Sequence, residues 1–266
     1  MNTLKIIVLS IVQGITELLP VSSTGHLILT GKILDFDISG SLFFLSVLHI
    51  GTTLAIIVFY RKELFKNFFT KEKWIFFAKI LIASIPTIVI GFLFEDYISS
   101  VLHGNTVIAL SLIIIGILFI VFENCKSKRG PLDPKDIPLW KMFVIGIGQT
   151  LALIPGTSRS GITTLTGMIL GIEKYSAFKF SFILGVPVLL GSSIYEITKT
   201  YLETTEPSLL TASIAVVKML PVIVLTFAVG YITLLIVEKF KKKRWLTVFG
   251  VYRIITGILI LILMII

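Results

Sequence analysis

The sequence predicts an all-α integral membrane protein, with six transmembrane helices plus two re-entrant helical hairpins arranged as an inverted-topology repeat. Of its 266 residues, 55% are hydrophobic and only 15% are charged, and the mean hydropathy is +1.00. Apolar runs of about 20 residues, the length that crosses a bilayer, recur along the chain. Two further runs are interrupted by polar residues and proline at matching places in the two halves, a pattern typical of a binding site inside a membrane protein.

The first interrupted run covers residues 4–34. Gln13 and Glu17 lie four residues apart on one face of the predicted helix, and Pro20 then breaks the backbone hydrogen bonding. The apolar piece that follows, 26–34, is too short to cross a hydrocarbon core about 30 Å thick. We therefore expect a hairpin that returns to the side from which it enters. An ionisable residue at membrane depth, such as Glu17, indicates a functional site.

Three full-length spans are predicted next, and the pattern then starts again. The expected spans are 41–60, 74–94 and 106–122, then a second hairpin at 139–171, then spans 176–197, 208–237 and 245–266. At an offset of 136, Gln13 matches Gln149, Ser22 matches Ser158 and Gly25 matches Gly161. We predict a single membrane domain, 1–266, built of two repeats at about 1–124 and 139–266 and joined by a cytoplasmic loop.

The loop charges predict the orientation in the membrane. Residues 61–73, 126–141 and 239–244 each contain five lysines or arginines, whereas 97–105 contains none and 198–212 contains one. Lysine and arginine concentrate in cytoplasmic loops, so both termini are expected on the outer side of the membrane. The first hairpin then opens to the outer face and the second to the cytoplasm. The net charge of +9 lies in these loops and does not indicate nucleic-acid binding.

Hydroxyl groups follow the break in each hairpin. Past Pro20, Ser23 or Thr24 is expected to cap a helix that begins near Gly25. Residues 157–161, Thr-Ser-Arg-Ser-Gly, repeat this arrangement in the second hairpin. Two opposed helix N-termini favour an anion, and the planar guanidinium of Arg159 suits phosphate or carboxylate.

The first break also contains proton-transfer groups. Glu17 and His26 form a candidate acid/base pair, and Ser23, three residues before His26, is a candidate nucleophile. Phosphoryl transfer needs groups that stabilise charge on the equatorial oxygens, a nucleophile in line, and a proton donor for the leaving oxygen. The two breaks together therefore predict a phosphoryl-transfer site.

These motifs resemble the signatures of the undecaprenyl-pyrophosphate phosphatase family, the bacitracin-resistance type. Residues 17–26 read Glu-Leu-Leu-Pro-Val-Ser-Ser-Thr-Gly-His, with Gln13 four residues before, and residues 155–161 read Pro-Gly-Thr-Ser-Arg-Ser-Gly. The resemblance extends over nearly the whole chain in length, motif spacing and order of spans. It implies hydrolysis of undecaprenyl pyrophosphate to undecaprenyl phosphate and inorganic phosphate, which recycles the carrier lipid for peptidoglycan and other cell-wall synthesis.

The resemblance also implies roles for the matched residues. Catalysis is assigned to Glu17, Ser23, His26 and Arg159, and substrate binding to Gln13, Ser22, Thr24, Thr157, Ser158 and Ser160. Either Ser23 or His26 is the nucleophile, and we favour Ser23. The family implies a divalent cation, Mg²⁺ or Ca²⁺, with Glu17 as its candidate ligand. Gln13 stands where the family allows Glu or Gln, which weakens a site with two carboxylates.

The expected partners are the isoprenoid pyrophosphate and the bilayer, with a homodimer as an open alternative. A transporter or flippase for an anionic lipid phosphate is the alternative function, because inverted repeats with broken helices are common in secondary transporters. Glu17, Ser23 and His26 gathered at one break favour the enzyme. His49 is expected to pack within its helix rather than to act in catalysis. Four cations within apolar runs are expected to be structural and to reach the membrane faces: Lys79, Lys179, Lys218 and Arg253.

Overall fold

The computed structural model describes residues 3–36, 42–94, 97–98, 104–124, 133–203, 209–240 and 244–264. For residues 124, 209–217 and 240 it describes the backbone alone. Within these ranges the chain forms helices and no strand, as the sequence predicts. Parts of the loops used in the charge argument, 99–103, 125–132, 204–208 and 241–243, lie outside the described residues.

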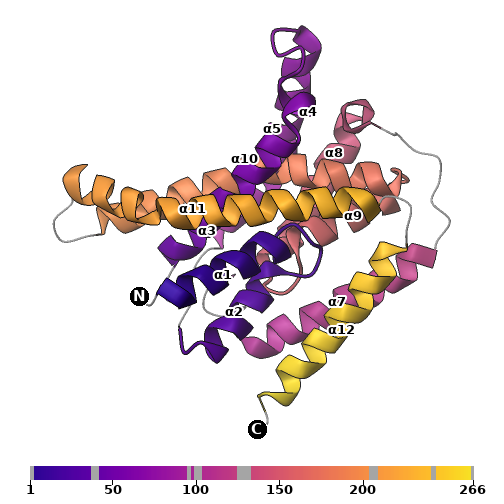
Figure 1. Cartoon of the computed structure of the whole chain (residues 1–266). Coiled ribbons are helices and arrows are strands. Elements are labelled where there is room, and N and C mark those ends of the chain that lie inside the picture. The colour runs from indigo at the N-terminus through magenta and orange to yellow at the C-terminus, as the bar shows by residue number, and fades with distance from the viewer. Residues whose placement is uncertain are drawn as a thin grey trace.

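Six helices are long and apolar enough to cross a membrane, which confirms the predicted number. Their bounds are α3 Leu42–Phe59, α5 Lys71–Leu93, α7 Asn105–Asn124, α10 Lys174–Leu202, α11 Leu209–Val237 and α12 Trp245–Ile262 (Figure 1). Large apolar side chains are exposed along them, among them Phe92, Leu93 and Val248, each about two-thirds exposed. Contiguous apolar surface on this scale suits a lipid environment, where such side chains need no cover from protein.

Two pairs of shorter helices occupy the interrupted runs. In the first pair, α1 Thr3–Thr16 packs on α2 Ser23–Ile33, and in the second, α8 Leu139–Gln149 packs on α9 Arg159–Ile169 after a 3-10 turn at Thr150–Leu153. The remaining short elements are α4 Arg61–Phe65 and the 3-10 turns Pro134–Asp136 and Glu238–Phe240. Each pair is interrupted where the sequence places its prolines and hydroxyl groups, so both breaks are real.

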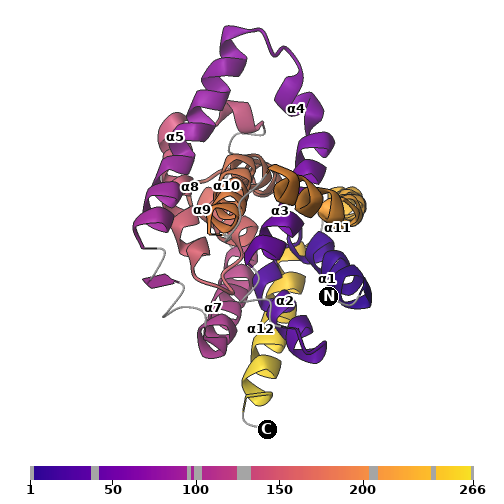
Figure 2. The same ribbon diagram turned by 90° about the vertical axis from the view of Figure 1, so that its left-hand side faces the viewer.

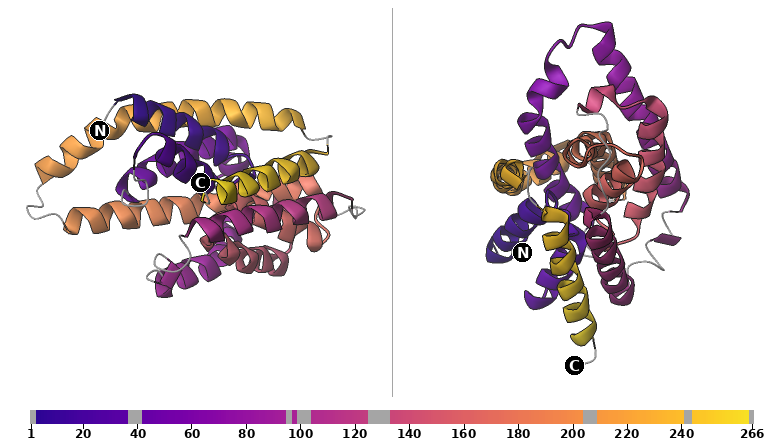
Figure 3. Two further views of the ribbon diagram at one scale, coloured as in Figure 1. Left: turned by 90° about the horizontal axis from the view of Figure 1, so that it is seen from below. Right: turned by 90° about the vertical axis from the view of Figure 1, so that its right-hand side faces the viewer.

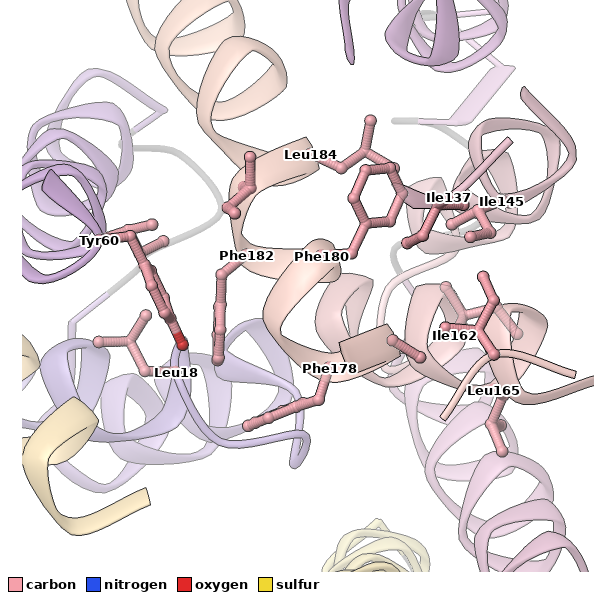
Figure 4. Packing of buried hydrophobic residues seen from close by; sticks show 14 of the residues in the cluster. Leu18, Tyr60, Ile137, Ile145, Ile162, Leu165, Phe178, Phe180, Phe182 and Leu184 are labelled. Atoms are coloured by element: carbon pink, nitrogen blue, oxygen red, sulfur yellow. The ribbon is translucent and has the colours of Figure 1, made fainter. Parts of the chain in front are cut away.

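The centre of the molecule is α10, which packs on α3, α5 and α9. Phe178 and Phe182 of α10 face one side, where Phe182 lies beside Tyr60 with their ring centres 6.1 Å apart (Figure 4). Phe180 and Leu184 face the other side, toward Ile145 of α8 (Figure 4). Because alternate faces of α10 contact different elements, this helix holds the two short-helix pairs in a fixed relation.

Glycines allow the closest helix crossings. A Cβ at Gly250 of α12 would lie 2.6 Å from the carbonyl oxygen of Gly116 in α7, and a Cβ at Gly257 would lie 2.7 Å from that of Ala109. The helices α7 and α12 consequently run side by side (Figure 3). Small residues at such contacts are the usual means of packing helices in membranes, since they let backbones approach. The α7–α12 pair carries both Tyr252 and Arg253 to the site described next.

Candidate active site

The two breaks have the same backbone geometry. Ser22 has φ 73° and ψ 97°, and Ser158 has φ 70° and ψ 111°, so both residues adopt a left-handed conformation that is uncommon outside glycine. Each serine is the N-cap of the helix that follows, and its hydroxyl accepts the backbone N–H of the glycine three residues on, Gly25 or Gly161. Backbone strain of this kind costs about 1–3 kcal/mol per residue and gathers at functional sites. The expectation that Ser23 or Thr24 caps α2 was wrong, because Ser22 does so.

The carboxylate of Glu17 joins the two breaks. Its Oε1 accepts a hydrogen bond from Nη2 of Arg159 at 3.0 Å, and its Oε2 accepts one from the hydroxyl of Ser23 at 2.6 Å. Glu17 is only 8% exposed, and the Arg159 side chain is almost as well buried. A buried charged pair of this kind requires good geometry and additional hydrogen bonds to offset its desolvation. The structure thus places Glu17, Ser23 and Arg159 in one hydrogen-bonded group, although Arg159 is distant in sequence.

Two further side chains face the same carboxylate. Nε2 of Gln13 donates to Glu17 Oε2 at 3.4 Å, as their spacing on one helical face predicts. His49 of α3 brings its Nε2 to 3.6 Å from the same oxygen. The sequence predicted only that His49 packs or hydrogen-bonds in its helix, and its place beside Glu17 was missed. No local motif marks it, since α3 reaches the site only through tertiary packing.

His26 lies beside this group, with both ring nitrogens engaged. Nδ1 is 2.7 Å from the carbonyl oxygen of Ser22, which can only accept, so Nδ1 carries a proton. Nε2 is 2.7 Å from the hydroxyl oxygen of Tyr252, and in the neutral imidazole it accepts a hydrogen bond from that hydroxyl. The side chain that contacts the Ser23 hydroxyl is therefore that of Glu17 rather than that of His26. Tyr252 is 44% exposed, so the His26 side of the site reaches the surface of the chain.

Arg253 holds the two breaks together from α12. It is fully buried, and its guanidinium donates to the carbonyl oxygen of Pro20 at 3.0 Å and to those of Gly156 and Thr157 at 2.7 and 3.0 Å. It also lies 5.4 Å from the centre of the Phe119 ring. The predicted structural role is right, but the predicted position at a membrane face was wrong. Each carbonyl belongs to a break that lacks helical hydrogen bonding, and Arg253 supplies the missing donors.

Lys179 is paired rather than free: its Nζ lies 2.6 Å from Oε1 of Glu63, in the lysine-rich segment, and 5.7 Å from the centre of the Tyr60 ring. Lys218 is exposed on α11. The places of both lysines at membrane faces stay predictions.

The residues assigned to substrate binding all lie at the breaks. Gln13, Ser22, Thr157 and Ser160 are buried, and Thr24 and Ser158 are partly buried. The hydroxyls of Ser158 and Ser160 are 3.5 Å apart, at the start of α9. Two buried atoms near Glu17 have no hydrogen-bond partner among the described residues: Oε1 of Gln13 and Nε of Arg159. An unpaired donor on a buried cation is costly, and it offers a position for one oxygen of an anion.

Gly185 of α10 creates the space that Arg159 occupies. A Cβ at this position would lie 2.0 Å from Nη1 and 2.3 Å from Cζ of Arg159, whose Nη1 donates to the carbonyl oxygen of Ser181 at 2.9 Å. Helix α10 therefore sets the direction of the guanidinium.

Replacing Gly185 with alanine should displace Arg159 without unfolding the protein, because the clash falls on the far end of a flexible side chain. We expect kcat/KM for phosphate release to fall about 10²-fold, the usual cost of a displacement near 1 Å in a catalytic group. Gly191→Ala on the same helix is the matched control, since nothing lies within 4 Å of its added Cβ. Equal activities of the two variants would contradict this position for Arg159.

A divalent cation has a small donor set here. Among the described residues no group of three or more His, Cys, Asp or Glu side chains is placed to hold a metal. Glu17 offers one carboxylate, and the orphaned Oε1 of Gln13 offers one more oxygen. Mg²⁺ usually retains several waters and takes few protein ligands beside the substrate phosphates. The residues present fit a cation held jointly with a substrate, but not an all-protein site.

The fold and the site define a helical membrane protein in which a buried carboxylate, a serine and an arginine meet from two separate helix starts. Comparison with known families agrees with this class. Residues 6–259 match the model of the bacitracin resistance protein BacA family, and the chain belongs to that family.

Curated relatives match over nearly their full length. The chain is 37% identical to an undecaprenyl-diphosphatase of Enterococcus faecalis, over 98% of this chain and 96% of the relative. It is 38% identical to the undecaprenyl-diphosphatase of Latilactobacillus sakei subsp. sakei (98% and 97%), and 39% identical to undecaprenyl-diphosphatase 1 of Clostridioides difficile (97% and 94%).

Proposed function

We propose that this protein hydrolyses undecaprenyl pyrophosphate to undecaprenyl phosphate and inorganic phosphate. The single observation that carries the proposal is the Glu17 carboxylate, which contacts a nucleophilic hydroxyl from one break and a phosphate-binding guanidinium from the other. The names of the curated relatives support the same substrate. The activity recycles the carrier lipid of cell-wall synthesis, and it accounts for the link of the family to bacitracin resistance.

The terminal phosphate binds between the two helix starts. Nε of Arg159 supplies a free donor, and the first backbone N–H groups of α2 and α9 supply others. Arg159 then shares its charge between Glu17 and the phosphate, so it stabilises the negative charge that spreads over the equatorial oxygens during transfer. Thr157 and Ser160 are buried and lie within two residues of Arg159 in the sequence. Both line the proposed phosphate site.

Ser23 attacks the terminal phosphorus, with Glu17 as its base. The bond from Ser23 Oγ to phosphorus forms as the bond to the bridging oxygen breaks, Glu17 takes the hydroxyl proton, and undecaprenyl phosphate leaves with the electron pair. Water then attacks the phosphoserine, Glu17 returns its proton to the departing Ser23 oxygen, and phosphate leaves as H₂PO₄⁻. Positioned proton transfer of this kind contributes about 10²–10⁴ in rate.

His26 and Tyr252 act on the leaving group, undecaprenyl phosphate. Their hydrogen bond lies at the exposed edge of the site, where the second phosphate and the lipid must emerge. A proton from this pair can neutralise the departing oxygen. An apolar groove beside the same break, lined by Gly25, Ile28, Leu29, Ile108 and Ile260, takes the first isoprene units. Attack by His26 in place of Ser23 is the alternative, and a phosphohistidine that survives in Ser23→Ala would establish it.

Re-entrant hairpins and an inverted repeat account best for the two short-helix pairs. Each half contains one pair and three long helices, and the two serine caps share one geometry. With the lysine-rich loops in the cytoplasm, the site faces the outer side of the cytoplasmic membrane.

Labelling of single cysteines introduced near Lys66 and Asn105 tests this orientation, since only the second should react with an impermeant reagent from outside. A homodimer stays a prediction, which sedimentation in detergent tests.

Mg²⁺ or Ca²⁺, when bound, would neutralise charge on the phosphate oxygens. Glu17 and Oε1 of Gln13 would hold it together with the substrate. Replacing Gln13 with glutamate adds a second carboxylate, so we expect the half-saturating Mg²⁺ concentration to fall about tenfold, because affinity follows the charge count of the ligands. Chelation by EDTA should remove activity from both proteins reversibly. Unchanged Mg²⁺ dependence in Gln13→Glu would exclude Gln13 as a ligand.

Phosphate release by the purified protein tests the function. We expect release from a C55 or C15 isoprenoid pyrophosphate, and its loss when Ser23 and His26 are both replaced by alanine. In sealed vesicles, movement of labelled lipid monophosphate without release of inorganic phosphate would instead establish the transporter. That outcome, or full activity of the double variant, would contradict the proposal.

A further inference from the structure

A second cavity lies at the lysine-rich end of the chain. Helix α4 and the start of α5 project from the rest of the molecule and are joined by the turn at 66–70 (Figure 2). Between them and the 3-10 turn Pro134–Asp136 lies a cavity of about 830 Å³. Its lining combines charged side chains with three apolar ones, Ile75, Phe76 and Ile183, of which Ile75 is well exposed. The cavity is therefore amphipathic.

The charged groups of the cavity leave a positive surplus. Two of its four carboxylates are compensated, since Glu63 pairs with Lys179 and Asp133 with Lys135. The others, Glu72 and Asp136, have no cation within salt-bridge distance among the described residues. Four lining lysines have no carboxylate within salt-bridge distance among the residues that the structure describes: Lys62, Lys66, Lys73 and Lys79. Lys73 still donates to the backbone carbonyl of Glu63, which leaves three ammonium groups free for a ligand.

Aromatic side chains show where this end meets the membrane surface. The rings of Phe65, Phe68, Phe69, Trp74 and Phe77 contact one another, and Phe69 is 95% exposed. Exposed aromatic clusters of this kind lie at the level of the lipid headgroups. Lys79 lies about 7 Å further along α5 than Trp74, at about 1.5 Å per residue. An unpaired ammonium below the aromatic level is costly unless it meets an anion.

We propose that this cavity binds an anionic glycerophospholipid of the leaflet on the lysine-rich side. The phosphodiester lies among Lys62, Lys66 and Lys79, and one acyl chain follows the exposed side chain of Ile75 on α5. Basic pockets between membrane helices on the cytoplasmic side bind such headgroups. Neither Lys66 nor Lys79 contacts the catalytic group, so this site is separate from the phosphatase reaction.

Binding of phosphatidylglycerol to the delipidated, full-length protein in detergent tests the proposal by native mass spectrometry. We expect Lys79→Gln to raise the dissociation constant about fivefold, and Lys66→Gln with Lys79→Gln about 25-fold, from the usual contribution of a lysine near an anionic headgroup. Lys71→Gln is the matched control, because Lys71 lies on the same helix but does not line the cavity. Phosphatidylcholine should bind weakly and equally to all four proteins.

Three outcomes would overturn the proposal. The first is an equal affinity of Lys79→Gln and Lys71→Gln for phosphatidylglycerol. The second is equal binding of phosphatidylcholine and phosphatidylglycerol to the wild type. The third is displacement of the lipid by millimolar inorganic phosphate, which would indicate a site for the free anion. Phosphate release from a C15 isoprenoid pyrophosphate verifies that each variant is folded. If Lys79→Gln does not fold, Lys66→Gln replaces it, because Lys66 is exposed and its loss should also raise the dissociation constant for phosphatidylglycerol about fivefold.

Discussion

Replacing Glu17 with glutamine is expected to lower kcat for phosphate release about 10⁴-fold, with little change in KM. The amide keeps the shape of the side chain, but it removes the carboxylate that contacts Ser23 at 2.6 Å, our proposed base, and the negative charge beside Arg159. Loss of an orienting carboxylate in a catalytic group has an effect of this size. A change in kcat without a change in KM shows that the interaction acts in the transition state. Steady-state kinetics with a C55 isoprenoid pyrophosphate measure both.

Glu173→Gln is the matched control for this variant. Glu173 caps α10 through the backbone N–H of Ser176, so its replacement also removes a carboxylate from a helix start, but away from the breaks. We expect activity within about twofold of the wild type, since the loss of one cap costs only about 1 kcal/mol of stability. A Glu17→Gln protein that keeps more than a tenth of the wild-type kcat would show that another group activates the nucleophile.

Arg159→Lys is expected to lower kcat/KM about 10²–10³-fold. Lysine keeps the positive charge but cannot bond Glu17, the Ser181 carbonyl and a phosphate oxygen together, as the planar guanidinium can. Removing one donor from a site that stabilises developing negative charge has an effect of this order. The measurement is the initial rate of phosphate release at low substrate concentration, in detergent.

The control for Arg159→Lys is the same substitution at Arg61. Arg61 is exposed and donates only to the backbone carbonyl of Val58, so its replacement by lysine should leave kcat/KM unchanged. A loss of thermal stability in Arg159→Lys, without a loss of kcat/KM, would mean that Arg159 serves the fold alone.

Much of the helical plan follows from the sequence because it depends on local properties. A span needs about 20 apolar residues whatever its neighbours are, so α3, α5, α7, α10 and α12 begin and end within a few residues of their predicted limits. The breaks were found for a similar reason. Proline and a cluster of hydroxyl residues interrupt helical hydrogen bonding wherever they occur.

The spacing of Gln13 and Glu17 predicted their contact, but the other partners of the site residues depend on tertiary packing and were not predicted. The spacing of three between Ser23 and His26 predicted a contact between them, but the left-handed backbone of Ser22 presents its carbonyl to the His26 ring, and Ser23 bonds Glu17 instead. Arg253 reaches Pro20 across most of the chain. The available signal was an arginine in an apolar span, which indicates a buried polar partner at least as well as a position at the membrane surface.

A double-mutant cycle tests the central claim most directly, namely that Glu17 and Arg159 act as one catalytic unit formed by both breaks. The quantity to measure is kcat/KM for phosphate release from undecaprenyl pyrophosphate by the wild type, Glu17→Gln, Arg159→Lys and the protein with both changes. If the two residues act together, the double variant will be about as slow as Glu17→Gln alone, because residues that act as a unit are strongly non-additive. Independent effects, which multiply to a loss of about 10⁶–10⁷-fold, would contradict this account.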